Sequence, residues 1–452
     1  MNEQARSAPA EVLLGVTLAT PFLANLIPYP LLLGLAAAPA GLGLILVTRP
    51  PRSGLNGFAK GALGNPVALL LWLILAFQFL GVLQSSDPLA PRLLRDLTAG
   101  FALAVIASAA PGIAPSRAAS MRVLMAFLGA LVALAAASSI LGLAKLFLLE
   151  RGIVLKILQW FYPVEYPWGS SLKRDYNFFA LSILIGMLAL TEIWFRSERP
   201  LERHLLSALL GAMAVAGAYA GSRRFWLVAP LVLGAQFAFV WWRGRGQAAA
   251  SRRWLGLIAV AAIVGAGLLQ LIDSARDIDF AVLDQLFQGQ SVTDPGYRSA
   301  REAIGADFRS RASMLASSSE SFGIASRLDR WRYALELVDW RTLFVGAGFD
   351  YHQSFGCRFL ECQDIDYPHS AILSSLLYGG VGALLVSIAY VGLILVLGFR
   401  LVRQGGAAVT AGLALATAFP FFMISGDSFS SLPGLTALAI LGSMLTGPRA
   451  AG

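Results

Sequence analysis

Charged side chains are scarce in this chain. Asp, Glu, Lys and Arg make up 13% of its 452 residues, whereas hydrophobic residues make up 57% and the mean hydropathy is +0.68. This balance excludes an ordinary soluble globular domain, in which about a quarter of the residues are charged. The sequence also lacks a Walker motif, a G-x-S-x-G elbow and an H-E-x-x-H motif, so it offers no support for a P-loop NTPase, an α/β-hydrolase or a zinc protease.

Long apolar runs dominate what is present. We predict twelve that can cross a hydrocarbon core of about 30 Å. The backbone of each run must be helical, because the bilayer offers no water to pair with its N–H and C=O groups. The expected fold is therefore all-α and polytopic, with about twelve transmembrane helices. The runs are residues 11–28, 30–48, 66–84, 97–114, 123–149, 177–195, 205–221, 225–242, 254–272, 379–399, 406–425 and 429–447.

Basic residues predict the orientation of these spans. With the N-terminus in the cytoplasm, every predicted inner connection is basic, as the positive-inside rule requires. An even number of spans then places both termini in the cytoplasm and one long polar segment outside. The chain divides into helices 1–9 (1–272), this large polar segment with short helices (273–368) and helices 10–12 (369–452). The net charge of +9 is thus mostly topological, and no nucleic-acid partner is expected. The inner arginines include Arg117, Arg122, Arg196, Arg199, Arg203, Arg243, Arg400 and Arg403.

The polar segment is where water-facing chemistry is expected. Ser326-Arg327-Leu328-Asp329 resembles a capping box that opens a helix, with an apolar stripe of Leu328, Trp331, Leu335 and Val338 against the membrane domain. The glycines of Val345-Gly346-Ala347-Gly348 would end that helix. Arg327 then either faces the membrane entrance or is solvated beside Asp329.

The segment ends at Tyr367-Pro368-His369-Ser370, which places a histidine at the mouth of a membrane helix. His352, the other histidine of the segment, lies further from the membrane and is expected to tolerate alanine. Cys357 and Cys362 are the only cysteines. Outside the membrane they could form a disulfide that closes a small loop before His369, and buried free thiols are the alternative.

Three further basic residues fall on the predicted outer boundary, against the positive-inside trend. Arg223 and Arg224 stand between the seventh and eighth spans, and Arg174 precedes the sixth, next to Asn177. Arginine offers a planar fork that fits phosphate oxygens, so an anionic headgroup or a phosphate-bearing substrate would account for them. Snorkelling of the side chains to the lipid surface is the alternative.

Two other chemistries are open at this point. Asp277-x-Asp279 and Asp364-x-Asp366 have the spacing of carboxylates that hold Mg²⁺ or Mn²⁺ in some glycosyltransferases, although such pairs arise easily in an acidic loop. Twelve helices would also suit a transporter or a flippase for lipid-linked or polyanionic substrates. Carriers usually place charges or broken helices at the membrane midplane, however, and the spans here are nearly free of acidic residues.

Taken together, the motifs resemble the O-antigen ligase and O-antigen polymerase superfamily of bacterial membrane glycosyltransferases. The resemblance covers roughly residues 170–390. Pro368-His369-Ser370 departs from the Pro-His-Asn common in the family, which leaves the role of that asparagine open. The motifs are Arg174-Asp175-Tyr176-Asn177, Ser222-Arg223, Ser326-Arg327-Leu328-x-x-Trp331, Phe344-Val345-Gly346-x-Gly348 and Pro368-His369-Ser370 with Leu373, Gly379 and Gly382.

The resemblance implies a metal-independent, inverting glycosyltransferase at the periplasmic face of the bacterial inner membrane, without a cofactor. Its donor would be a glycan on undecaprenyl pyrophosphate. The acceptor would be lipid A-core for a ligase or a lipid-linked glycan for a polymerase, and the sequence does not separate the two. His369 would act as general base. Arg174, Arg223, Arg224 and Arg327 would stabilise the departing pyrophosphate.

The arginine asymmetry makes the topology testable by single-cysteine labelling. Because inner connections are basic, an impermeant thiol reagent should reach Ser197→Cys and Gln247→Cys only from the cytoplasmic side. The same reagent should reach Ser317→Cys only from outside. Labelling of position 317 from the cytoplasm would overturn the scheme.

Overall fold

The computed structural model describes residues 3–26, 54–86, 91–151, 153–161, 167, 169–173, 175–243, 322–362, 365–425 and 433–446, together with positions 257, 258, 261, 262, 265 and 268. Within these residues the regular elements are helices and no strand is present. Five of the helices are long and apolar enough to cross a bilayer: α4 (Pro66–Gln84), α6 (Arg117–Glu150), α8 (Tyr176–Arg196), α10 (Arg223–Arg243) and α17 (Ala371–Gln404). This finding supports the class of helical membrane protein.

Five further helices coincide with predicted spans, and most of them have a shorter apolar stretch. They are α1 (Glu3–Leu26), α5 (Pro91–Ile113), α9 (Pro200–Tyr219), α18 (Ala407–Ser425) and α19 (Pro433–Thr446). The predicted span 30–48 lies outside the described residues, as does 254–272 except at the six single positions. The number of twelve spans therefore stays a prediction. Of the predicted periplasmic segment 273–368, the structure describes residues 322–362 and 365–368.

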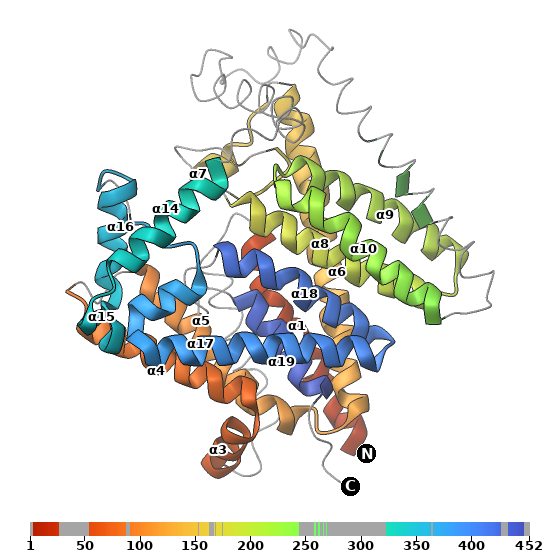
Figure 1. Cartoon of the computed structure of the whole chain (residues 1–452). Helices are drawn as coiled ribbons and strands as arrows, with labels where there is room; N and C mark the ends of the chain where they lie inside the picture. Colours follow the sequence, from red (N-terminus) through yellow and green to blue (C-terminus); the bar gives the residue numbers. More distant parts are fainter. Residues whose placement is uncertain are drawn as a thin grey trace. The chain divides into compact units, whose positions relative to one another are not determined.

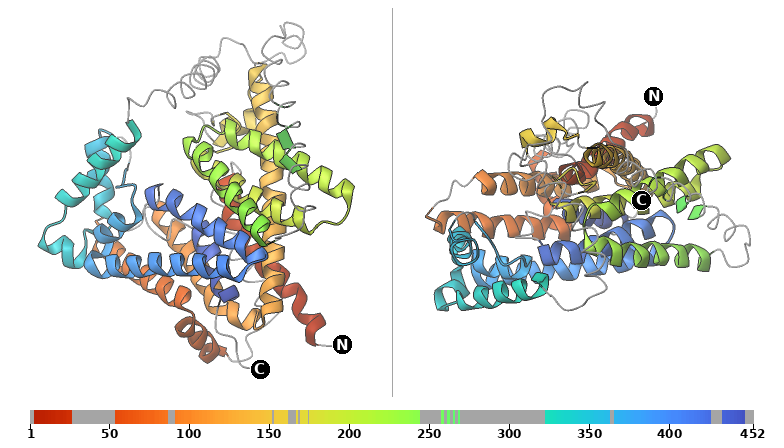
Figure 2. Two further views of the ribbon diagram at one scale, coloured as in Figure 1. Left: turned by 45° about the vertical axis from the view of Figure 1, so that its right-hand side comes forward. Right: turned by 90° about the horizontal axis from the view of Figure 1, so that it is seen from above.

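The chain forms two compact units. The first contains residues 1–21, 31–127 and 321–452, and the second contains residues 22–30 and 128–320. In the first unit α17 packs against α4, α18 and α19, while α5 packs against α4 and against α3 (Gly54–Gly64) (Figure 1). In the second unit α8 packs against α9 and α10, and these helices form the yellow-green to green group in the left view of Figure 2.

Helix α17 is two helices joined at a kink. Gly379 and Gly380 have non-helical backbone angles, so a short helix over residues 371–378 precedes a long one over residues 381–404. Gly380 has φ +65°, which a residue without Cβ adopts at little cost. The predicted span 379–399 thus begins at this kink, and the preceding short helix begins at the N-cap residue Ser370.

The prediction of a single helix that begins at Ser326 and ends at Gly346 is wrong in two respects. Helix α14 (Phe322–Glu336) begins four residues earlier, so Ser326 lies inside it, and a separate helix α15 (Trp340–Val345) follows. The break arises at Asp339, whose side chain accepts a hydrogen bond of 2.7 Å from the Thr342 N–H and so caps a new helix.

The buried face of α14 also differs from the predicted stripe. Leu328 and Leu335 are exposed, whereas Ala334 is buried. Ala334 packs in an aromatic core with Tyr351, Phe355 and Tyr378. Tyr351 and Phe355 belong to α16 (Tyr351–Phe359), which follows the single 3₁₀ turn η1 (Gly348–Asp350). The aromatic side chains of α16, absent from the predicted stripe, decide which side of α14 is covered.

Glycines allow α15 to contact the kink of α17 through backbone atoms. The Ala347 N–H donates a hydrogen bond of 2.6 Å to the Leu377 carbonyl. A Cβ on Gly346 would lie 2.4 Å from the Tyr378 carbonyl oxygen, and one on Gly380 would lie 2.5 Å from the Phe344 carbonyl carbon. The glycines at 346 and 380 are therefore needed for close packing, whatever else the sequence motifs do.

This packing predicts that Gly346→Ala destabilises the protein by at least about 2 kcal/mol, because the new Cβ overlaps Tyr378 and Gly346 has φ +87°. Thermal unfolding of purified protein in detergent measures the effect. Gly392→Ala is the control, since Gly392 lies inside α17 and a Cβ there meets nothing within 4 Å. Equal unfolding temperatures for the two variants would contradict the packing argument.

Candidate functional site

His369 is held at the start of the short helix 371–378. It has φ +53°, a left-handed conformation that is uncommon for a residue with a side chain and costs about 1–3 kcal/mol. The next residue, Ser370, is the N-cap of α17, and its hydroxyl accepts from the Leu373 N–H. Serine and asparagine are comparable N-caps, so Ser370 provides at this position the cap that an asparagine would provide.

Asp366 lies between His369 and an arginine of α14. One carboxylate oxygen, Oδ1, is 3.3 Å from His369 Nε2, and the other, Oδ2, accepts a hydrogen bond of 2.9 Å from Arg330 Nε. The Asp366 side chain is 7% exposed and that of Arg330 16%, whereas His369 is 31% exposed. We call these three side chains the histidine cluster. Only its histidine keeps substantial access to solvent.

The surroundings of Asp366 keep it ionised. Burial alone would raise the pKa of this carboxyl, but hydrogen bonds from His369 and the Tyr367 N–H and the charge of Arg330 outweigh burial and lower the pKa below its usual value. A lowered pKa favours the folded state above the unfolded-state value, and this contribution is lost as the pH falls through the folded-state pKa. At neutral pH, His369 therefore lies beside a carboxylate.

Aromatic rings support the cluster. The Tyr367 and His369 rings have centroids 4.3 Å apart, and the Arg330 guanidinium lies 4.6 Å from the centroid of Phe359. The Asp366 N–H donates to the His352 carbonyl at 3.2 Å. His352 itself is buried and contacts the rings of Phe349, Tyr351, Tyr367 and Tyr378. His352 is thus part of the core, and the expectation that alanine is harmless there does not fit its burial.

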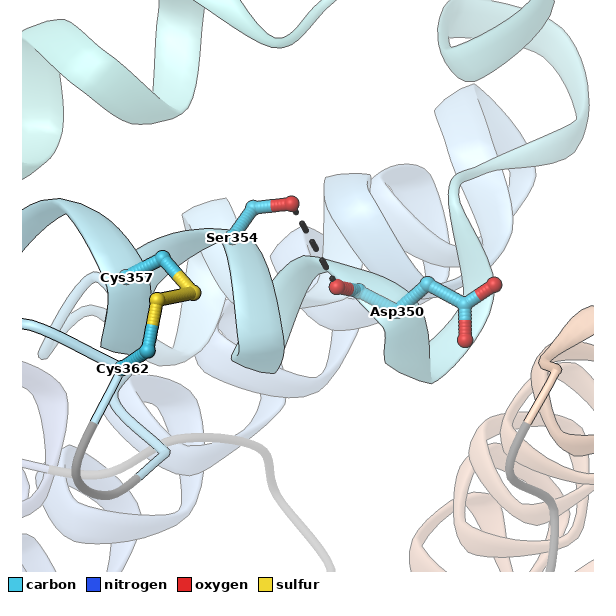
Figure 3. Close-up of a disulfide and its surroundings, with 4 residues drawn as sticks. All are labelled: Asp350, Ser354, Cys357 and Cys362. Atoms are coloured by element: carbon cyan, nitrogen blue, oxygen red, sulfur yellow. Dashed lines mark hydrogen bonds between the residues drawn. A yellow bond between two sulfur atoms is a disulfide. The ribbon is translucent and has the colours of Figure 1, made fainter.

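Both ends of the η1–α16 segment are held by specific bonds. At one end the Asp350 carboxylate accepts hydrogen bonds from the Ser86 N–H at 3.0 Å and from the Ser86 hydroxyl at 3.1 Å. At the other end Cys357 and Cys362 form a disulfide across the last turn of α16 (Figure 3). The disulfide closes a small loop of residues 357–362 on the N-terminal side of Asp366.

The sequence singled out Arg327, and the structure adds Arg330. The two arginines are three residues apart on α14 and therefore share a face of the helix. Arg327 is half-buried and Arg330 pairs with Asp366. Two spacings could have revealed this, Arg327-x-x-Arg330 on a helix and Asp366-x-x-His369 before one. Both are weak signals because arginine and aspartate are frequent throughout the polar segment.

A second cluster lies in the other unit, at the turn between α9 and α10. The Ser222 hydroxyl, which is fully buried, donates a hydrogen bond of 3.0 Å to the Asn177 side-chain oxygen. This bond joins the start of α10 to the start of α8. Asp175 caps α8 and lies within electrostatic reach of Lys173 and Arg224. We call Lys173 and residues 175–177, with Ser222 and Arg224, the arginine turn. Arg223 is the first residue of α10, and Arg174 lies outside the described residues.

Lys145 holds the loop that leads to the arginine turn. Its side chain is fully buried in α6, and Nζ donates hydrogen bonds to the Pro167 carbonyl at 2.7 Å and the Ser171 carbonyl at 2.6 Å. The Ser170 N–H reaches the Tyr219 carbonyl at 3.2 Å, and Gly169 approaches the same carbonyl with φ +46°. The sequence does not indicate this role of Lys145, because a lysine near the end of an apolar run is usually interpreted as a side chain that snorkels to the membrane surface.

Loss of the Lys145 amine group should loosen this loop. Lys145→Met leaves two buried carbonyls without their donor, at about 1–3 kcal/mol each. We expect a lower unfolding temperature and faster tryptic cleavage after Lys173. Lys156→Met makes the same chemical change at an exposed lysine and is the control. If the two variants unfold and are cleaved alike, Lys145 does not order the loop.

Comparison with known proteins adds no family assignment to this geometry. No protein-family model, curated protein or solved structure matches the chain.

Proposed function

We propose that the protein is a metal-independent, inverting glycosyltransferase of the O-antigen ligase or polymerase type. It transfers a glycan from undecaprenyl pyrophosphate to an acceptor hydroxyl at the periplasmic face of the bacterial inner membrane. The observation that carries the proposal is the pairing of His369 with the ionised Asp366 at the end of the polar segment. The motif resemblance supplies the substrate class, and the apolar helices supply the membrane setting.

His369 serves as the general base in this proposal. An imidazole that donates its Nε2–H to the Asp366 carboxylate carries its lone pair on Nδ1, the atom that would take a proton from the acceptor hydroxyl. The carboxylate fixes the ring orientation and stabilises the imidazolium that forms, as a base and its orienting group do in other enzymes. Arg330 has a positioning role, because its guanidinium pairs with Asp366 and keeps that carboxyl ionised.

The departing pyrophosphate requires cationic partners. We assign this role to Arg174, Arg223, Arg224 and Arg327, in keeping with the sequence motifs. The support is local to each unit: the Ser222–Asn177 bond orders the turn that carries Arg224, and Arg327 shares a helix face with Arg330. Guanidinium groups stabilise phosphate charge without a metal ion. Attack by the acceptor oxygen on the anomeric carbon, with departure of the pyrophosphate from the opposite side, inverts that centre.

The acceptor decides between the two types of enzyme. Purified protein in nanodiscs, given a lipid-linked donor in the presence of EDTA, should transfer the glycan to lipid A-core if it is a ligase and to a second lipid-linked glycan if it is a polymerase. Activity lost on chelation and restored by Mg²⁺ would move the chemistry to an Asp-x-Asp site. Solute uptake into proteoliposomes without transfer would establish the alternative of a transporter or a flippase.

The base assignment makes a quantitative prediction for this assay. His369→Ala should lower turnover by a factor on the order of 10²–10⁴ while the protein still folds and inserts. Asp366→Asn should lower turnover by at least about tenfold, because the amide orients the ring less well and cannot stabilise the imidazolium.

The chain provides a matched control for the histidine. His204 is exposed on α9, so His204→Ala deletes the same side chain without touching the cluster. Near-normal transfer by the His369 variant would exclude His369 as the base. Equal losses in the His369 and His204 variants would show that the assay reports general damage.

A further inference from the structure

An open groove lies at the end of α17 that follows the predicted span. Its volume is about 640 Å³, and its apolar side consists of Leu395, Val396 and Phe399. Its polar side contains Arg400 and Arg403, and Thr446 of α19 also lines the groove. All of these residues belong to one compact unit, in which α17 packs against α19. The groove thus combines exposed aliphatic and aromatic surface with two guanidinium groups.

Across the described part of the chain, neither Arg400 nor Arg403 forms an ion pair, and the groove has no acidic residue in its lining. The Arg403 guanidinium lies 5.3 Å from the centroid of Phe399, so it borders apolar surface directly. By contrast, Arg122 and Arg196, which belong to other predicted inner connections, pair with Glu11 and Glu192. The charge of the groove is therefore available to an anion.

The apolar residues of the groove precede its arginines along α17, at a spacing that fits a ligand with an anionic end and a hydrocarbon end. Leu395 and Val396 lie four to eight residues before Arg400 and Arg403, which is about 6–12 Å along a helix axis. This is the direction into the predicted span. A ligand that is anionic at one end and hydrocarbon at the other would satisfy both sides of the groove at once. Gln404, whose amide donates a hydrogen bond of 3.0 Å to the Leu445 carbonyl, joins α17 to α19 and keeps the groove formed.

We propose that this groove binds an anionic phospholipid, with the phosphate on Arg400 and Arg403 and an acyl chain along Leu395, Val396 and Phe399. The inference is independent of glycan transfer. Free inorganic phosphate would use the two arginines but would make no contact with the apolar side formed by Leu395, Val396 and Phe399. Basic residues at the ends of membrane helices bind anionic lipid headgroups, and each one raises the affinity about fivefold.

Native mass spectrometry of delipidated protein in detergent tests the proposal. Titration with phosphatidylglycerol should give one preferred bound lipid, and the same titration with phosphatidylcholine should give no preferred lipid. The double variant Arg400→Gln/Arg403→Gln should weaken phosphatidylglycerol binding by about thirtyfold. The conservative variant Arg400→Lys/Arg403→Lys keeps the charge and should retain most of the binding.

A matched control removes the same charge elsewhere. Arg196→Gln/Arg199→Gln alters two arginines of another predicted inner connection that do not line the groove, and it should leave binding unchanged. Equal weakening in this control, or equal binding of phosphatidylcholine by the native protein, would overturn the proposal. Displacement of phosphatidylglycerol by millimolar inorganic phosphate would identify a phosphate site and would also overturn it. Thermal unfolding checks that each variant is folded. Phosphatidylglycerol should raise the unfolding temperature of every protein except the Arg400→Gln/Arg403→Gln variant.

Discussion

The backbone contact between α15 and the kink of α17 is the constraint on which the polar part of this protein depends. Two chain segments that approach at carbonyl-to-Cα distance leave no room for side chains, so glycine is required at positions 346 and 380. On one side of the contact the short helix 371–378 leads back to Ser370 and His369. On the other, α15 leads back to α14 and Arg330. A single packing event therefore fixes both ends of the histidine cluster relative to the long helix 381–404.

The histidine cluster shows how a buried carboxylate can be kept charged. Asp366 gains a hydrogen bond from His369 on one oxygen and from Arg330 on the other, and these interactions outweigh the cost of burial. The consequence for His369 is orientation as well as electrostatics. Its left-handed backbone conformation, its tilted ring contact with Tyr367 and its carboxylate partner each restrict the side chain. Such restriction costs free energy, which is expected of a functional position rather than of an ordinary cap residue.

Buried polar side chains in α6 and in the adjoining turns stabilise the backbone by hydrogen bonding. Lys145 donates hydrogen bonds to backbone carbonyls of a loop, and Ser170 of that loop donates to the Ala216 carbonyl of α9. Ser222 joins the starts of two helices. In a membrane setting these groups have little access to water, so an irregular loop is stable only if side chains satisfy its backbone. These buried hydrogen bonds order the arginine turn, and therefore the backbone that carries Arg224. The open groove on α17 is the opposite case, since its arginines lack an ion-pair partner in the described protein.

The sequence by itself determined the helical class and the approximate helix limits, because apolar runs of that length have no other way to satisfy their backbone in lipid. It also identified His369, Arg224 and Arg327 as conspicuous, since charged and titratable groups are rare in such a chain. Only the tertiary structure decided that Arg330 and Asp366 join His369, that Leu328 and Leu335 are exposed and that His352 lies in the core. These outcomes depend on which elements pack against each other. Spacing along one helix cannot reveal a partner that comes from 36 residues further along the chain, as Asp366 does for Arg330.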